Sequence, residues 1–146
     1  MGAALTQHPE MFRAVVSFVG IYDMLRTEAI TANAVYNITE YGTIKDPEQF
    51  KALFAYSPYH HVTNGTAYPA VLFLTGANDP RVNPANSRKM TARLQAASSS
   101  GLPILLRTSS TSGHGARSLD EGLAQQADVY AFLFHELGME NALSGN

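Results

Sequence analysis

Three runs of consecutive apolar residues recur along the chain, at residues 14–19, 70–75 and 103–108. Each run is rich in Val, Leu, Ile or Phe, and a glycine or a proline bounds it at one end or both. Strands that are buried on both faces are apolar at consecutive positions, whereas half-buried strands alternate. The runs therefore predict three strands of a parallel sheet.

Helix signals occupy the segments between and after these runs. Asp46-Pro47 and Asn83-Pro84 each place an N-cap residue before a proline at the first helical position, and Gln49 stands where it can reach back to its cap. Ser118 and Glu121 form a capping box that opens a last helix. Apolar residues at helical spacing predict the apolar sides of the last two helices: Met90, Leu94 and Ala97 in one, and Leu119, Leu123, Tyr130, Phe134 and Leu137 in the other.

Alternating strands and helices predict an α/β fold, and the start of the chain bears on how much of that fold is present. Residues 1–7 resemble the end of a helix, and no apolar strand precedes them. Three strands also make a thin sheet, since flavodoxin-like sheets have about five. A small complete domain is one interpretation. The interpretation that we favour is a single partial domain over residues 1–146, the C-terminal half of a larger fold.

A partial domain has a consequence for association. Strand 14–19 would pair with a further strand in an intact sheet, so its outer edge would be bare and apolar in this chain. We therefore expect a homo-oligomer that buries the exposed strand edge, for example by strand pairing across a two-fold axis.

The charge balance narrows the classes of partner. The 146 residues contain 10 Lys and Arg against 12 Asp and Glu, a formal net charge of −2, which offers no basic field for a nucleic acid. No apolar run approaches the roughly 20 residues of a membrane-spanning helix, and the first residues lack the features of a signal peptide. The sequence thus predicts neither a nucleic acid nor a membrane partner, and it leaves open a cytoplasmic or a periplasmic location.

Cysteine and tryptophan are absent from the sequence. Without cysteine the chain has no disulfide, no thiolate zinc site and no thiol nucleophile. His60 and His61 are adjacent, so in a strand they would face opposite ways, and no third ligand stands at a suitable spacing. The sequence therefore predicts no metal and no cofactor.

Two polar loops follow the second and third predicted strands. Asp79 stands in the first loop, and His114 stands between two glycines in the second. Catalytic groups in open parallel sheets collect at the carboxyl ends of the strands, where these loops lie. A carboxylate there can accept the Nδ1 proton of an imidazole, which fixes its tautomer and stabilises the imidazolium ion. The flanking glycines would let the backbone present His114 at an unusual angle.

Each of these residues also has a plain structural interpretation. Asp79 lies in a turn-forming Asn-Asp-Pro sequence, and His114 can be an ordinary polar loop residue. Together, however, they follow the Asp-then-His order of α/β-hydrolases. Such enzymes also carry a nucleophilic serine in a Gly-x-Ser-x-Gly turn from strand to helix, and no serine in the chain has these neighbours. Because the opening helix is what should follow such a turn, we expect the nucleophile upstream of Met1.

Longer motifs resemble one family of peptidases. Over roughly residues 5–137, the motifs that agree in order and spacing are Ser57-Pro58-Tyr59-His60-His61-Val62, Tyr68-Pro69-Ala70, Thr39-Glu40-Tyr41-Gly42, Asp79-Pro80-Arg81-Val82 and Ser112-Gly113-His114-Gly115. They resemble the C-terminal part of the catalytic domain of the prolyl oligopeptidase family of serine peptidases. The resemblance implies the C-terminal half of an α/β-hydrolase fold, with about three parallel strands and flanking helices. It also implies that Asp79 and His114 are the triad carboxylate and base, and that Arg81 binds a substrate backbone carbonyl.

One position departs from the family pattern. Asn37 occupies the place where prolyl oligopeptidases carry a tryptophan that stacks on the substrate proline. An amide offers hydrogen bonds but no aromatic face, so the residue preferred at the cleavage site is left open. Tyr41 would still line an apolar pocket that binds the substrate, although simple core packing is the other interpretation of this residue.

The expected function is hydrolysis of short peptides through a Ser-Asp-His triad whose serine lies upstream of this chain. The chain by itself is then expected to be inactive, and a peptide is the expected partner of the intact enzyme. Two alternatives stay open: an esterase of the same fold, and a non-catalytic α/β module that binds a partner at its strand ends. The substrate length and the presence of a propeller domain are also left open.

Overall fold

A computed structural model describes residues 1–30, 34–116 and 118–139. The predicted strands are all present, each within one residue of its predicted bounds: β1 (Ala14–Phe18), β2 (Ala70–Gly76) and β3 (Ile104–Ser109). They form a parallel sheet in the order β1-β2-β3, with Val15 beside Val71 and Val71 beside Ile104. The prediction of a parallel α/β fold is confirmed.

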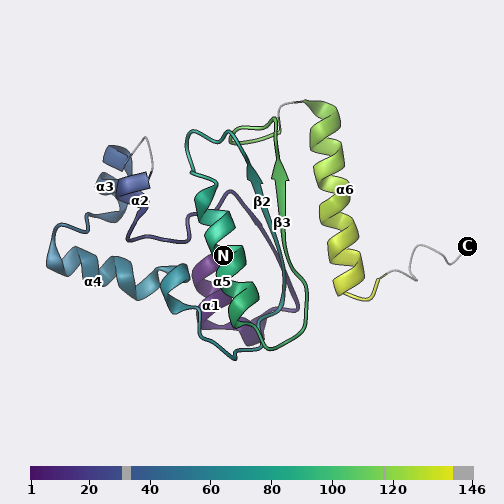
Figure 1. Cartoon of the computed structure of the whole chain (residues 1–146), viewed down its shortest axis with the longest axis horizontal. Coiled ribbons are helices and arrows are strands. Elements are labelled where there is room, and N and C mark those ends of the chain that lie inside the picture. Colours follow the sequence, from purple (N-terminus) through teal and green to yellow (C-terminus); the bar gives the residue numbers. More distant parts are fainter. Residues whose placement is uncertain (31–33, 117, 140–146) are drawn as a thin grey trace, which may run out of the picture.

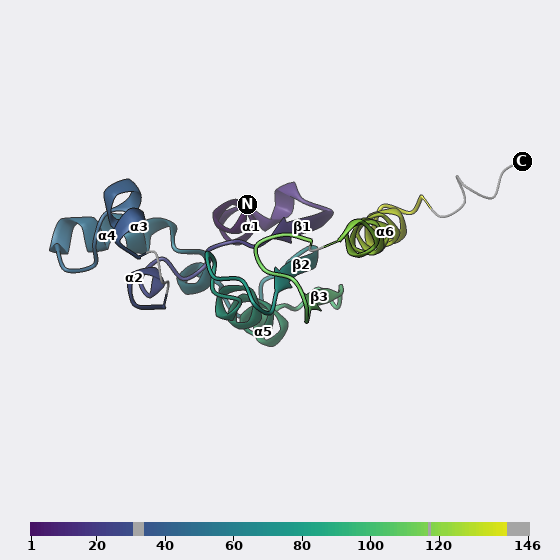
Figure 2. The ribbon, with the colours of Figure 1, turned by 90° about the horizontal axis from the view of Figure 1, so that it is seen from above.

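Helices cover both faces of this sheet and extend beyond it at one side. Figure 2 shows α1 and α5 on one side of the strands and α6 on the other. The segment between β1 and β2 forms a helical insert, α2 to α4, which lies away from the sheet beyond α1 and α5 (Figure 1). The helices and 3-10 turns are α1 (Gly2–Gln7), η1 (Pro9–Met11), α2 (Thr27–Ile30), α3 (Ala34–Tyr41), α4 (Pro47–Tyr56), η2 (Pro58–His61), α5 (Ala85–Ala97) and α6 (Leu119–Glu136).

Two hydrophobic clusters, one on each face of the sheet, form the core. Every residue of β2 is buried, because Val71 and Phe73 face α5 while Leu72 and Leu74 face α6. The cluster on the α5 side includes the predicted residues Met90, Leu94 and Ala97. Burial on both faces is the physical reason for the runs of consecutive apolar residues.

The helix-start predictions are confirmed at two caps. Asp46 Oδ1 accepts hydrogen bonds from Glu48 N and Gln49 N at the start of α4, and Ser118 Oγ accepts one from Glu121 N at the start of α6. The side chain of Gln49 does not return to Asp46; its Oε1 accepts from Thr43 N instead.

The start of α5 differs by one residue from the prediction. The helix begins at Ala85 and not at Pro84, and Asn83 Oδ1 accepts a hydrogen bond from Ala85 N.

The apolar side predicted for α6 is wrong as a core face. Leu119, Leu123, Tyr130 and Leu137 are exposed, between 49% and 77%. The residues that bury against the sheet are Val129, Phe132 and, in part, Leu133. Since each residue turns an α-helix by about 100°, the predicted stripe lies one residue step around the helix from the buried one.

The end of β1 is a strained turn. The prediction extended this strand to Val19, but the strand ends at Phe18 and Val19 has a φ of 41°. A β-branched residue rarely adopts this left-handed conformation, because it costs energy. Residues with such strained backbones are found most often at functional sites. The residues that follow this turn lead on to α2, and among them Tyr22 packs its ring against Phe73 of β2, with 5.2 Å between the ring centres.

No helix in the described ranges is both long and apolar enough to cross a membrane.

Candidate active site

The loop after β2 holds Asp79 in a fixed orientation. The Asp79 side chain is fully buried, and its Oδ1 accepts hydrogen bonds from Arg81 N at 2.8 Å and Val82 N at 2.9 Å. These bonds close a turn of the kind in which an aspartate caps the backbone two and three residues ahead. The plain interpretation of Asp79 as a turn-forming residue is therefore physically correct, but it occupies only one carboxylate oxygen.

The other oxygen of Asp79 faces His114. His114 Nδ1 lies 2.9 Å from Asp79 Oδ2, and about a third of the His114 side chain is exposed. Burial raises the pKa of Asp79, but the hydrogen bonds from Val82, His114 and Arg81 outweigh it and hold that pKa below its ordinary value. An ionised carboxylate only accepts, so Nδ1 is the donor, and in the neutral imidazole the lone pair is on Nε2. The pair can thus accept a proton at Nε2 from a neighbouring hydroxyl.

Backbone contacts hold the two loops together. Ala77 N donates to Ser109 O at 2.8 Å, and Asn78 N donates to Ser112 O at 3.1 Å. This approach requires a glycine at position 76, because a Cβ there would stand 2.1 Å from Gly113 O and 2.5 Å from Ser112 O.

The expectation for the glycines that flank His114 is not met. Neither Gly113 nor Gly115 has a φ in the left-handed region that favours glycine, so an unusual backbone angle is not what presents the imidazole. Gly76, on the neighbouring strand, is the glycine on which the position of His114 depends.

Four of the predicted site residues line one pocket of about 380 Å³. They are Asn37 and Tyr41 from α3, Arg81 from the Asp79 loop, and His114. Asp79 does not line it, because it is buried behind His114. Segments that are far apart in the sequence thus meet at the carboxyl ends of β2 and β3.

Sequence reasoning missed three residues that complete this pocket: Ile21, Glu40 and Val82. Glu40 bonds to the neighbouring Tyr41, and this hydrogen bond raises the pKa of the Tyr41 hydroxyl above its ordinary value. Glu40 stands within the motif Thr39-Glu40-Tyr41-Gly42, and Val82 follows Arg81, so the motifs contained a signal for both. Ile21 gave none, since only the turn after β1 brings it here.

The serines near His114 are engaged elsewhere. Ser109 and Ser112 line a smaller pocket, of about 70 Å³, on another side of His114, together with Phe18, Val19 and Gly76. Both hydroxyls donate to the carboxylate of Glu121 on α6. Ser112 is also buried. Because both hydroxyls donate to Glu121, neither is oriented to give its proton to His114 and act as a nucleophile.

The described ranges contain no group of three His, Cys, Asp or Glu side chains placed to hold a metal ion.

A parallel sheet with an Asp and a His on loops at adjacent strand ends is the arrangement of α/β-hydrolases. Comparison with known proteins narrows this class. The chain matches the prolyl oligopeptidase family over residues 1–140 and belongs to that family.

Relatives and solved structures agree with this assignment. The chain is similar to a prolyl endopeptidase of Elizabethkingia meningoseptica, with 40% identity over 97% of this chain and 20% of the relative. It is also similar to a prolyl endopeptidase of Dictyostelium discoideum, with 36% identity over 92% of this chain and 18% of the relative. The chain thus spans about a fifth of the length of these relatives.

Among solved structures, a prolyl endopeptidase superposes with a TM-score of 0.89 at 41% identity, over 94% of this chain and 20% of the other. Oligopeptidase B from Leishmania major superposes with a TM-score of 0.88 at 24% identity, over 94% of this chain and 19% of the other, which supports the fold alone.

Proposed function

We propose that this chain supplies the Asp-His part of a serine peptidase active site, together with part of the pocket that binds a short peptide. The nucleophilic serine comes from a polypeptide segment outside these 146 residues. The observation that carries the proposal is the hydrogen bond of 2.9 Å between the buried Asp79 and the partly exposed His114, which lines a pocket together with Arg81. In this arrangement His114 is the general base and Asp79 orients it.

The space around His114 supports this placement of the serine. The pocket of about 70 Å³ lies between His114, the end of β1 and the end of β2. In the described part of the chain, β1 pairs with β2 alone, so its other edge is free to receive a strand. A strand paired there would end beside this pocket, because parallel strands finish at the same edge of a sheet.

Arg81 favours a peptide over a simple ester as the substrate. Its backbone N–H is fixed by Asp79, and the exposed Arg81 lines the pocket of about 380 Å³. A guanidinium donates several hydrogen bonds in a fixed plane and suits the carbonyl oxygens of a peptide backbone.

We propose that the residue before the cleaved bond is not restricted to proline. Asn37 is partly buried in the pocket wall, beside Tyr41 and Glu40, and it offers an amide where an aromatic ring would stack on proline. We therefore expect cleavage after residues other than proline, at rates comparable with those after proline.

The test is peptide hydrolysis by the full-length polypeptide that contains this chain. Substitution Asp79→Asn should lower turnover by about 10⁴, because a wrongly held imidazole cannot take the serine proton, and His114→Ala should lower it by a similar or larger factor, because it removes the base itself. A fluorophosphonate probe should label one serine outside residues 1–146 in the wild type. Unchanged turnover in the Asp79→Asn variant would exclude the triad role and favour a non-catalytic module.

The isolated 146-residue chain provides a second arm of the test. It should show no serine-dependent turnover, because loss of a triad nucleophile costs about 10⁶ in turnover. Fluorophosphonate-sensitive hydrolysis by this chain would contradict a serine supplied from outside.

We further propose that the isolated chain self-associates through the free edge of β1. Phe18, at the end of this strand, is 46% exposed, and an unpaired strand edge with apolar neighbours favours pairing with another chain.

A further inference from the structure

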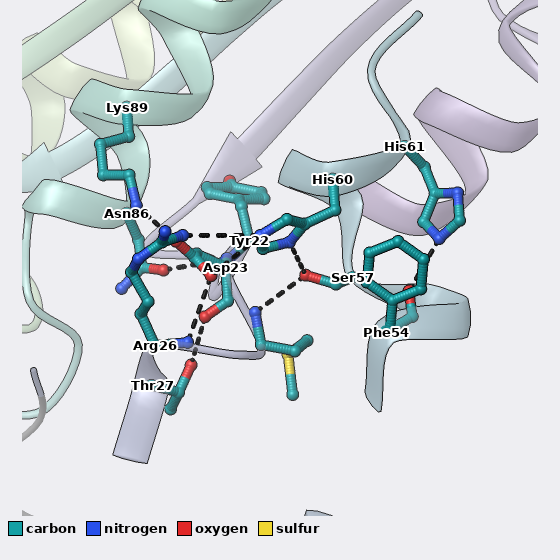
Figure 3. A network of polar contacts seen from close by, with 11 residues as sticks. Tyr22, Asp23, Arg26, Thr27, Phe54, Ser57, His60, His61, Asn86 and Lys89 are labelled. Atoms are coloured by element: carbon teal, nitrogen blue, oxygen red, sulfur yellow. Dashed lines mark hydrogen bonds and ion pairs between the residues drawn. The ribbon is translucent and has the colours of Figure 1, made fainter. Parts of the chain in front are cut away.

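A second cluster of polar side chains surrounds Asp23, in the segment that follows β1 (Figure 3). The Asp23 side chain is 1% exposed, and its Oδ2 accepts hydrogen bonds from Arg26 Nη1 at 3.0 Å and from Lys89 Nζ. Burial raises the pKa of Asp23, but Lys89 and Arg26 outweigh it and hold the pKa below its ordinary value. Asp23 is therefore an ionised carboxylate with two cationic partners.

Three segments meet at this cluster. Asn86 Oδ1, on α5, accepts hydrogen bonds from Tyr22 N at 3.2 Å and Asp23 N at 3.3 Å. Ser57 Oγ, at the start of η2, accepts one from Met24 N at 3.1 Å. The segment after β1 is thus fixed to α5 on one side and to η2 on the other.

Lys89 is held at two points. Its Nζ bonds to Asp23 and also lies 4.4 Å from the centre of the Tyr59 ring, within the range of a cation–π contact. His60 completes the η2 side, with Nδ1 2.8 Å from Ser57 Oγ and Nε2 3.9 Å from Asp23 Oδ1.

The segments joined here are those that build the pocket. Ile21, which lines the pocket, lies two residues before Asp23, and Thr27 at the start of α2 donates from Oγ1 to Asp23 O at 2.8 Å. On the other side, α5 directly follows the loop of Asp79. The cluster therefore lies where the pocket wall and the helical insert meet the helix that continues from the Asp79 loop, although Asp23 does not itself line the pocket.

Stability alone does not explain a buried carboxylate at this junction, whose cationic partners Arg26 and Lys89 are 57% and 34% exposed. Burying a carboxylate costs free energy that its ion pairs offset only in part, but the hydrogen bonds of Asp23 connect the segment after β1 to α5 in one geometry.

We propose that Asp23, through Lys89 and Arg26, is a positioning residue that fixes the wall of the substrate pocket relative to the loop of Asp79. The inference rests on the proposed function in one respect, which is that the pocket binds a substrate. The position of the wall itself is open to a separate test.

Amide hydrogen exchange of the 146-residue chain tests the wall directly. In Asp23→Asn, exchange should accelerate by about tenfold or more over residues 21–27 and 37–41, while β2 and α6 keep their wild-type rates. Equal acceleration in β2 would indicate a general loss of stability and overturn the proposal. Unchanged exchange over residues 37–41 would overturn it as well.

The full-length polypeptide tests the consequence for catalysis. With a chromogenic peptide substrate, Asp23→Asn should raise KM by about tenfold while kcat changes by less than about threefold, because a displaced wall weakens binding without removing the triad. A lower melting temperature with unchanged KM would overturn the positioning role. If the wild-type polypeptide does not hydrolyse peptides, the proposed function fails, and the exchange result still decides the inference.

Three further variants guard against misfolding. Lys89→Met leaves Asp23 bonded to Arg26 and should raise KM by less than Asp23→Asn does. Lys89→Arg keeps a cation at this position and should leave KM at its wild-type value. Glu48→Gln removes a solvent-exposed ion pair, Lys51 Nζ to Glu48 Oε1 at 2.8 Å, from α4 of the same insert. This matched control should leave KM and exchange unchanged.

Discussion

Asp79 shows how one side chain can serve a turn and a site together. One of its oxygens closes the loop through Arg81 N and Val82 N, and the other bonds to His114. Each contact stabilises the ionised carboxylate, so the features that fix the imidazole also lower the pKa of Asp79. Protonation of this residue therefore affects both the fold and the proposed base.

The pH dependence of stability should carry the signature of Asp79. Because its pKa in the fold is below the ordinary value of 3.8, the ionised form stabilises the fold above that pH, and this contribution is lost as the pH falls through the lower folded-state pKa. Asp79→Asn should therefore reduce the change in unfolding free energy between about pH 7 and pH 3 in urea denaturation. Asp120→Asn, on the exposed first turn of α6, is the control. The same pH profile for Asp79→Asn and wild type would contradict this.

Gly76 provides a second prediction at a single residue. In Gly76→Ala the added methyl group would overlap the backbone of Ser112 and Gly113, so the His114 loop must move away. We expect a loss of about 1–3 kcal/mol in the free energy of unfolding, measured by urea denaturation, with a changed chemical shift of the His114 ring. Gly115→Ala is the matched control, because nothing lies within 4 Å of a Cβ at that position. Equal stability of the two variants would argue against the close approach.

At the scale of elements, the strands followed their local pattern and α6 did not. A strand such as β2 is buried on both faces, so every apolar position counts and no choice of face is needed. α6 carries two apolar stripes, and its contact with the sheet, through Val129 and Phe132, selects the less regular one. Periodicity identifies an apolar stripe, but the partner decides which stripe is buried.

This distinction is measurable on α6. Phe132→Ala should cost about 3–5 kcal/mol of unfolding free energy, because Phe132 packs against the sheet, whereas Leu123→Ala should change it by less than about 0.5 kcal/mol. Urea denaturation of the isolated chain gives both values. A larger cost for Leu123→Ala than for Phe132→Ala would show that the helix turns its other face to the sheet.

At the scale of the whole molecule, the sheet has helices on both faces but keeps a free edge at β1 in the described structure. Phe18 is exposed at the end of that strand. The same edge borders the pocket of about 70 Å³ beside His114. The free edge of β1 is thus part of both proposals. It would pair with a strand that brings the serine, and it would be the contact through which isolated chains associate.

Self-association should therefore depend on Phe18. In light scattering at about tens of micromolar, the wild-type chain should have the mass of a dimer or larger oligomer. Phe18→Glu should shift this mass toward that of the monomer. Phe54→Glu on α4 is the control, since Phe54 is similarly exposed, at 42%, but lies in the helical insert. A monomeric wild-type chain, or an equal effect of both variants, would contradict association through β1.

The sequence by itself determined the three strands, the caps at Asp46 and Ser118, and the loops of Asp79 and His114. These features are local, because consecutive apolar residues, capping side chains and chain order carry them. Chain order on a parallel sheet also placed Asp79 and His114 at neighbouring strand ends.

Only the tertiary structure decided the buried face of α6, the need for Gly76, and the place of Ile21 and Glu40 in the pocket. It also joined Asp23 to Lys89 across the junction of three segments. Each of these depends on which surface meets which, and on how closely two backbones approach. A contact of that kind is a property of pairs of residues far apart in the chain, so no local pattern encodes it.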